Sequence, residues 1–128
     1  VTTKNNGAVP DLPVDCAVEV SSYIGSTGAR PIAFGPLEPA ERGWVQCMKN
    51  MELCVEEAAV TGDYGTLLQA FTINPQIVAG AKAKRIMDEL LIAHKKYLPQ
   101  FADTIARLEE EGVTIKDDIA RELTEKGL

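Results

Sequence analysis

The sequence holds few residues suited to acid–base, nucleophilic or metal chemistry, and these lie far apart. His94 is the only histidine. It lies in a helical pattern between Leu90 and Tyr97, with no His or Cys at ligand spacing around it. We interpret His94 as a hydrogen-bonded residue at the edge of the core. We therefore expect no catalytic residue, no cofactor-binding residue and no metal ligand within these 128 residues.

The three cysteines are interpreted as small core residues. Cys47 and Cys54 stand seven apart on an expected helix, which separates them by about 10 Å along its axis. A disulfide needs Cα atoms within about 7 Å, so these two cannot pair. Cys16 follows Asp15, whose charge disfavours a thiolate nucleophile. Reduced thiols are typical of a cytoplasmic protein.

Two pairs of adjacent carboxylates, Glu56–Glu57 and Asp88–Glu89, fall on expected helices. Adjacent residues on a helix point about 100° apart, so neither pair shares a face. We interpret them as surface charge. The sequence also lacks the glycine-rich phosphate loops and the Gly-x-Ser-x-Gly nucleophile motif.

Asn5, Asn6 and Gly7 are the strongest candidates for a binding role. Packing alone does not readily explain why two amides and a glycine precede a short strand. These residues either donate hydrogen bonds to a sugar or cofactor, or close a turn. We name all three as candidate substrate-binding residues.

The elements that position these residues begin with a hairpin. Alternating apolar residues predict a strand over 16–24, with Cys16, Val18, Val20 and Ile24 on one face. The 25–28 segment predicts a turn slightly longer than two residues. A returning strand is expected over 30–34, at a sheet edge because Pro31 lacks an N–H.

Four or five helices are expected to follow. One covers 39–61 and ends at Gly62, and a second covers 64–72 behind Asp63 as its cap. Asn74–Pro75 predicts the start of a third, over 75–97. The next ends at Gly112, and a last one covers 117–125. The expected buried positions are Trp44, Val45, Met48, Met51, Val55, Ala58, Ala59, Ile86, Met87, Leu90, Leu91, Leu98, Phe101, Ile105, Leu108, Ile119 and Leu123.

These elements predict an α+β fold, a short antiparallel hairpin packed with four to five helices. The net charge of −6 argues against nucleic acid, and no apolar run approaches the ~20 residues of a membrane span. Residues 113–128 read as an acidic helical tail. Two strands alone are marginally stable. The strands must therefore rest on the helices or on a sheet that continues upstream. Because a specific loop leads straight into a strand at 5–20, we expect this chain to be a piece of a larger protein.

Four segments together resemble glycoside hydrolase family 4. They are Asn-Asn-Gly-Ala-Val-Pro-Asp-Leu-Pro-Val-Asp at 5–15, Val-Glu-Val at 18–20, Gly-Ala-Arg-Pro-Ile at 28–32, and the 90–101 run. The last resembles the ending of the family's 6-phospho-β-glucosidases. The likeness spans about residues 5–112. The chain thus resembles the C-terminal portion of such an enzyme.

The resemblance implies hydrolysis of 6-phospho-β-glucosides by NAD-dependent oxidation and elimination, with a divalent metal, usually manganese, as Lewis acid. The nucleotide loop, metal ligands and base of the family lie upstream, so the chain alone is expected to be inactive. The fold would resemble the C-terminal domain of lactate and malate dehydrogenases. Residues 1–128 would then form a substrate and oligomerisation domain, whose partners are the phospho-sugar, its own N-terminal nucleotide-binding domain and further copies. Trp44, Met48 and Met51 would pack against those partners.

Two alternatives stay open from the sequence. One is the substrate domain of a 2-hydroxy acid dehydrogenase, which would need a histidine in a loop at the cleft, whereas His94 lies in a helical pattern. The other is a stand-alone module that dimerises or interacts through its helices.

Overall fold

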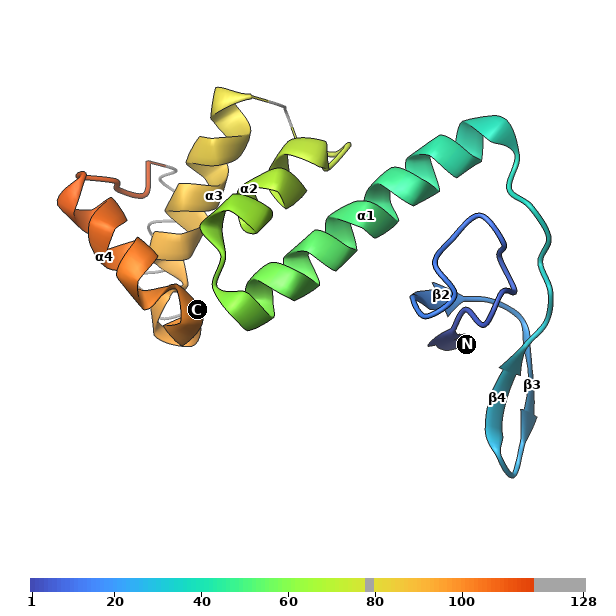
Figure 1. Cartoon of the computed structure of the whole chain (residues 1–128). Helices are drawn as coiled ribbons and strands as arrows, with labels where there is room; N and C mark the ends of the chain where they lie inside the picture. The colour runs from blue at the N-terminus through green and yellow to red at the C-terminus, as the bar shows by residue number, and fades with distance from the viewer. Residues whose placement is uncertain (78–79, 117–128) are drawn as a thin grey trace. The chain divides into compact units, whose positions relative to one another are not determined.

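The computed structural model describes residues 1–77 and 80–116. The chain divides into two compact units, Val1–Lys49 and Asn50–Leu128. The boundary falls within helix α1 (Pro39–Thr61) (Figure 1). The helix expected over 117–125, with Ile119 and Leu123, lies outside the described residues, as does most of the expected acidic tail.

The first unit contains two small antiparallel sheets. Strand β1 (Thr2–Lys4) pairs with β2 (Ala17–Glu19), so that Thr3 faces Val18. Strand β3 (Ser22–Gly25) pairs with β4 (Gly28–Pro31), and Tyr23 faces Arg30. Strand β1 was not predicted, because Thr-Thr-Lys carries no apolar alternation.

The single strand predicted over 16–24 is wrong. The chain forms two separate strands here, because β2 pairs with β1 in one sheet and β3 pairs with β4 in another. Cys16 and Val18 are buried as expected, but Ile24 is 68% exposed. A continuous strand would have placed all three on one face.

The hairpin between β3 and β4 is confirmed, with a tighter turn than predicted. Gly25 pairs with Gly28, which leaves only two residues in the loop. Strand β4 ends at Pro31 rather than at Phe34. The Phe34 N–H instead donates to the carbonyl of Ala8, 2.7 Å away, so this segment bonds to the loop after β1.

The bounds predicted for α1 are confirmed. Gly62 follows it at φ +73°, a left-handed conformation that glycine adopts at little cost. Asp63 then caps α2 (Tyr64–Ile73), and its carboxylate accepts from the Thr66 N–H at 2.5 Å. The apolar stripe of α1 is mostly uncovered, because Ala58 is its one fully buried residue and Trp44 is 58% exposed.

The third helix starts later than the Asn74–Pro75 signature predicted. The Asn74 N–H donates to Ala70 and its side chain accepts from the Gln76 N–H, so this asparagine ends α2 and closes a turn. Helix α3 covers Ala81–Ala93. It gives way to two 3₁₀ turns, Lys95–Tyr97 and Pro99–Phe101, and then to α4 (Ala102–Glu110).

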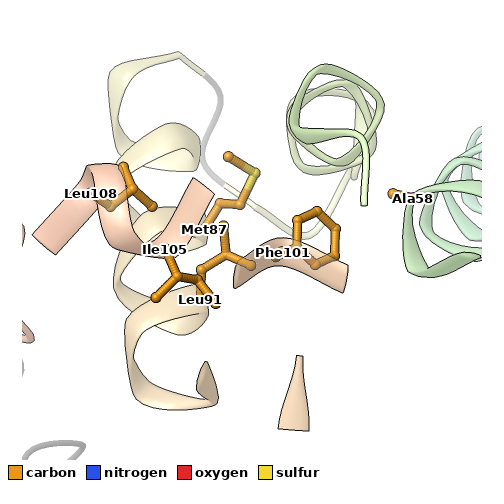
Figure 2. Close-up of a cluster of buried hydrophobic side chains, with 6 residues drawn as sticks. All are labelled: Ala58, Met87, Leu91, Phe101, Ile105 and Leu108. Atoms are coloured by element: carbon orange, nitrogen blue, oxygen red, sulfur yellow. The ribbon is translucent and has the colours of Figure 1, made fainter. Parts of the chain in front are cut away.

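The core of the second unit lies where α3, α4 and the second 3₁₀ turn meet (Figure 2). Met87 and Leu91 of α3 are buried, but Ile86 and Leu90 are about 40% exposed, so half of the predicted buried side of α3 is wrong. The α+β class is confirmed. Within the part of the chain that the structure describes, no helix is long and apolar enough to cross a bilayer. The buried cluster comprises Ala58, Met87, Leu91, Phe101, Ile105 and Leu108.

Candidate functional site

The three candidate residues form a tight turn at the end of β1. Asn6 has φ +47° and Gly7 has φ +83°, and the Ala8 N–H donates to the Asn5 carbonyl at 2.9 Å. Two successive left-handed residues define a primed β-turn, for which Asn-Gly is the preferred sequence. Among the described residues, Asn6 is the one residue other than glycine with positive φ. Turn formation therefore accounts for the Asn-Gly pair.

Asn5 lies behind this turn and is fully buried. Its Nδ2 donates to the carbonyls of Val9 (3.0 Å), Leu12 (3.2 Å) and Pro13 (2.9 Å). Its Oδ1 accepts from the Val9 N–H at 2.8 Å. An amide has two N–H donors, so at least one is shared between two carbonyls. The side chain of Asn5 is fully engaged by the 5–15 loop that it begins, and it presents no group to a ligand.

Asp11 fastens this loop to the segment before α1 and to α1 itself. Its Oδ2 accepts from the Leu37 N–H at 2.6 Å, and its Oδ1 lies 3.1 Å from Arg42 Nε. The Arg42 N–H is not aligned with the oxygen, so this second contact is an ion pair rather than a hydrogen bond. Gln46 Nε2 donates to the Asp11 carbonyl at 2.8 Å. These contacts join residues 26 to 35 positions apart, and no local sequence pattern predicts them.

The Asn6–Gly7 turn, called the tip of the 5–15 loop below, is an exposed part of that loop. Asn6 and Gly7 are exposed, whereas Asn5, Ala8 and Val9 are buried. No atom lies within 4 Å of the place where a Cβ on Gly7 would stand. An amide side chain and a backbone without a side chain are thus presented on a braced loop. That chemistry suits hydrogen bonding to hydroxyl or phosphate oxygens.

His94 is exposed and contacts the last turn of its own helix. It follows the last residue of α3, and its N–H and its Nδ1 each lie 3.0 Å from the Leu90 carbonyl. It also borders an apolar groove of about 390 Å³ in the second unit. The lining includes Val55, Leu67, Phe71, Tyr97, Leu98 and Phe101.

Asp88 corrects the prediction that the Asp88–Glu89 pair is surface charge. It is 4% exposed, accepts from the Tyr64 hydroxyl at 2.7 Å, and pairs with Lys84 Nζ at 2.6 Å. The hydrogen bond to Asp88 raises the pKa of Lys84. Burial, and then the hydrogen bond to Asp88, raise the pKa of Tyr64. The three side chains link α2 to α3, and the i,i+4 spacing of Lys84 and Asp88 was the one signal in the sequence.

Glu89 accepts hydrogen bonds from other residues than Asp88 does. Its Oε1 accepts from Arg85 Nε at 2.9 Å, and its Oε2 accepts from the Lys116 N–H at 3.0 Å. These hydrogen bonds lower the pKa of the Glu89 carboxyl, with the Arg85 contact the larger cause. Glu56 and Glu57 are exposed, as predicted.

The acidic, histidine and cysteine side chains of the described residues lie apart from one another. Across 1–77 and 80–116, no three His, Cys, Asp or Glu side chains converge as metal ligands would. The cysteines of the described chain form no disulfide. Cys16 is buried, as expected for a small core residue, but Cys47 and Cys54 are only half-buried.

The first unit thus consists of two short antiparallel sheets and a braced loop. Residues 1–77 match the model of the family 4 glycosyl hydrolase C-terminal domain. The chain belongs to this family of glycoside hydrolases.

Relatives of the chain include enzymes acting on phosphorylated sugars. It is 52% identical over 105 residues to a probable 6-phospho-beta-glucosidase of Bacillus subtilis, covering 82% of this chain and 24% of that protein. It also resembles a solved 6-phospho-alpha-glucosidase from gut microorganisms in complex with NAD and glucose-6-phosphate. That match has a TM-score of 0.73 and 31% identity, over 77% of this chain and 23% of the other. A second such structure, with NAD and Mn²⁺, has a TM-score of 0.73 and 28% identity, with the same coverage.

The chain therefore spans about a quarter of the length of the proteins it matches. What those proteins bind and hydrolyse is a property of the whole molecules.

Proposed function

We propose that the full-length protein is a 6-phospho-β-glucosidase and that residues 1–128 form most of its C-terminal domain. The observation that carries this proposal is the 52% identity to the Bacillus protein, which exceeds the 31% identity to the solved 6-phospho-alpha-glucosidase. The reaction would be the NAD-dependent oxidation and elimination of the family, with manganese as the metal. The chain alone would be inactive.

Within this function, the tip of the 5–15 loop would contact the sugar substrate. Asn6 would offer its amide, and Gly7 would let the substrate approach the backbone. The open surface at both residues supports this role. Asn5 would serve the site from behind, because its own amide is engaged by Val9, Leu12 and Pro13.

The cofactors and partners follow from the same proposal. NAD and manganese would be held by residues outside this chain, as the NAD- and Mn²⁺-bound relative suggests. The N-terminal nucleotide-binding domain and further copies of the protein would cover apolar surface such as Trp44, which is 58% exposed. A cytoplasmic location would agree with thiols that form no disulfide.

The decisive experiment compares the full-length protein with the 128-residue chain on a chromogenic 6-phospho-β-glucoside, with NAD and Mn²⁺ added. We expect turnover by the full-length protein only. The 6-phospho-α-glucoside serves as the matched substrate and should be turned over far more slowly. A full-length protein that prefers the α-anomer would overturn the β assignment, and turnover by the chain alone would overturn the domain assignment.

A second candidate function, association through the helices, has one observation in its favour. The second unit exposes the apolar groove of about 390 Å³. If the chain works as an interaction module, light scattering should show a stable dimer at micromolar concentration. The dehydrogenase alternative receives no such support, because His94 ends a helix and faces the Leu90 carbonyl.

A further inference from the structure

We propose that Asp11 is a positioning residue for substrate binding. It would fix the 5–15 loop to the start of α1 and so hold Asn6 and Gly7 in the position from which they contact the sugar. This inference rests on the proposed function, since it concerns the geometry of the same site. Asp11 itself is not part of the exposed tip and would not touch the substrate.

The first support is that both carboxylate oxygens of Asp11 are used by the segment leading into α1. One accepts from the Leu37 N–H at 2.6 Å, and the other lies 3.1 Å from Arg42 Nε. The Asp11 side chain is only 17% exposed. A short bond from an amide to a carboxylate is stronger than a bond between neutral groups.

A second layer of contacts joins the same two stretches of chain. Arg42 Nη2 donates to the Leu37 carbonyl at 2.8 Å, so that Leu37 is held through both its N–H and its C=O. Gln46, one turn further along α1, donates to the Asp11 carbonyl at 2.8 Å. These contacts form one network of Asp11, Leu37, Arg42 and Gln46. Its members come from the 5–15 loop, from the segment before α1 and from α1 itself.

The network connects to the tip through the backbone. The Ala8 carbonyl accepts from the Phe34 N–H at 2.7 Å and from the Gly35 N–H at 3.3 Å. Ala8 is the residue that closes the Asn6–Gly7 turn. The 34–37 segment therefore holds the loop at two points, beside the turn and at Asp11. Loss of the Asp11 carboxylate would leave the loop held by the Ala8 contacts and by the bond from Gln46 to the Asp11 carbonyl, and this weaker attachment would let the tip shift.

The buried amide of Asn5 makes the loop behave as one body in this motion. It ties Val9, Leu12 and Pro13 together whether or not Asp11 is attached to α1. Removing the Asp11 carboxylate should thus displace the tip without unfolding the loop. A displaced tip would weaken substrate binding and leave NAD binding unchanged.

The test uses the full-length protein, assayed as above, with five variants. Asp11→Asn keeps an acceptor for the Leu37 N–H but removes the charge that faces Arg42, whereas Asp11→Ala removes both. Arg42→Ala and the double variant Asp11→Ala/Arg42→Ala complete a mutant cycle. Asp15→Asn is the matched control, because Asp15 is an exposed carboxylate of the same loop. Thermal unfolding is recorded for each variant.

We expect Asp11→Ala to raise KM for the 6-phospho-β-glucoside by about 10- to 100-fold, with kcat changed much less. Asp11→Asn should fall between Asp11→Ala and the wild type. The Kd for NAD should stay constant, and Asp15→Asn should match the wild type. The effects of Arg42→Ala and Asp11→Ala on KM should be less than additive in the double variant, because both substitutions break the same contact.

Three outcomes would overturn the proposal. The first is that Asp11→Ala and Asp11→Asn have the same KM as Asp15→Asn. The second is that the effects of the Asp11 and Arg42 substitutions on KM are fully additive. The third is that NAD binding and kcat are lost in parallel. If Asp11→Ala fails to fold, Asp11→Asn decides the question. Failure of the proposed function would look different, because the wild-type protein itself would then not hydrolyse the substrate.

Discussion

The carbonyl oxygen of Gln100 occupies the place that a side chain at position 62 would need. Gly62 stands between α1 and α2, and Gln100 belongs to the 3₁₀ turn that carries the buried Phe101. A Cβ on Gly62 would overlap this oxygen, and the backbone there has φ +73°. Glycine is thus required twice, for its backbone conformation and for the close approach.

Gly62→Ala should therefore destabilise the chain strongly. A left-handed alanine costs about 1 kcal/mol, and forced displacement of a packed backbone costs about 1–3 kcal/mol more. Gly43→Ala is the matched control, because Gly43 lies in α1 with no atom within 4 Å of its would-be Cβ. That variant should gain about 0.5–1 kcal/mol. Urea unfolding followed by circular dichroism measures both, and equal midpoints for the two variants would contradict the contact.

Asp88→Ala should destabilise the second unit by about 2–3 kcal/mol, because it leaves the Tyr64 hydroxyl and Lys84 without their shared acceptor. Tyr64→Phe should lose only about 1 kcal/mol. The ring would still lie under the guanidinium of Arg107, 5.4 Å from its centroid. Chemical denaturation at neutral pH gives both values. A smaller loss for Asp88→Ala than for Tyr64→Phe would mean that the buried carboxylate is not the centre of this network.

The same three side chains predict a loss of stability at alkaline pH. In the folded chain the pKa of Tyr64 lies above its ordinary value of 10.0, and that of Lys84 above 10.5. The folded state keeps these protons at a pH where the unfolded chain has begun to lose them. Their contribution is therefore complete below about pH 10 and falls as the pH rises through the folded pKa values. Because Lys84 is about half exposed, solvent screening keeps its share small.

Unfolding midpoints measured from neutrality to above pH 10 check this prediction. The decline should be shallower in Asp88→Asn, which lacks the carboxylate that favours the protonated partners. An identical decline in both proteins would assign the alkaline loss to other groups.

At acid pH the cap of α2 should weaken. The hydrogen bond from the Thr66 N–H lowers the pKa of Asp63 below its ordinary 3.8. A lowered pKa contributes stability that is present above 3.8 and is lost as the pH falls through the folded value. Asp63→Asn keeps a capping oxygen but does not titrate. We expect its midpoint to change less between neutral and strongly acid pH than that of the wild type. Parallel curves would contradict a titrating cap.

The helix ends show how far local signals carry. Pro39, Gly62 and Asp63 act within one turn of their own position, so the sequence predicts the bounds of α1 and the start of α2. Asn74–Pro75 gives an equally clear local signal, but an asparagine can also close a helix, and here the Asn74 N–H donates to the Ala70 carbonyl at the end of α2. The start of α3 was missed for that reason.

Contacts between distant residues were beyond reach of the sequence. Periodicity treats Asp88 as surface, since nothing local shows that Tyr64, 24 residues away, meets it in the interior. Similarly, the Asn-Gly pair at 6–7 indicates a turn. The attachment of that loop through Asp11 to Leu37 appears only once the chain has folded back.

Asn5→Asp should strongly destabilise the 5–15 loop. The substitution replaces a donor by a charged acceptor facing the carbonyls of Val9, Leu12 and Pro13, in a site with no solvent exposure. Leaving buried acceptors unsatisfied costs about 1–3 kcal/mol, and a buried charge adds to this, so a total on the order of 3 kcal/mol is expected. Asn6→Gly is the control, because glycine adopts the positive φ of Asn6 freely. Hydrogen exchange of the Val9 amide reports the loop directly, since that N–H donates to Asn5 Oδ1. Protection should collapse in Asn5→Asp and persist in Asn6→Gly, and its survival in Asn5→Asp would show that the loop is held without its buried amide.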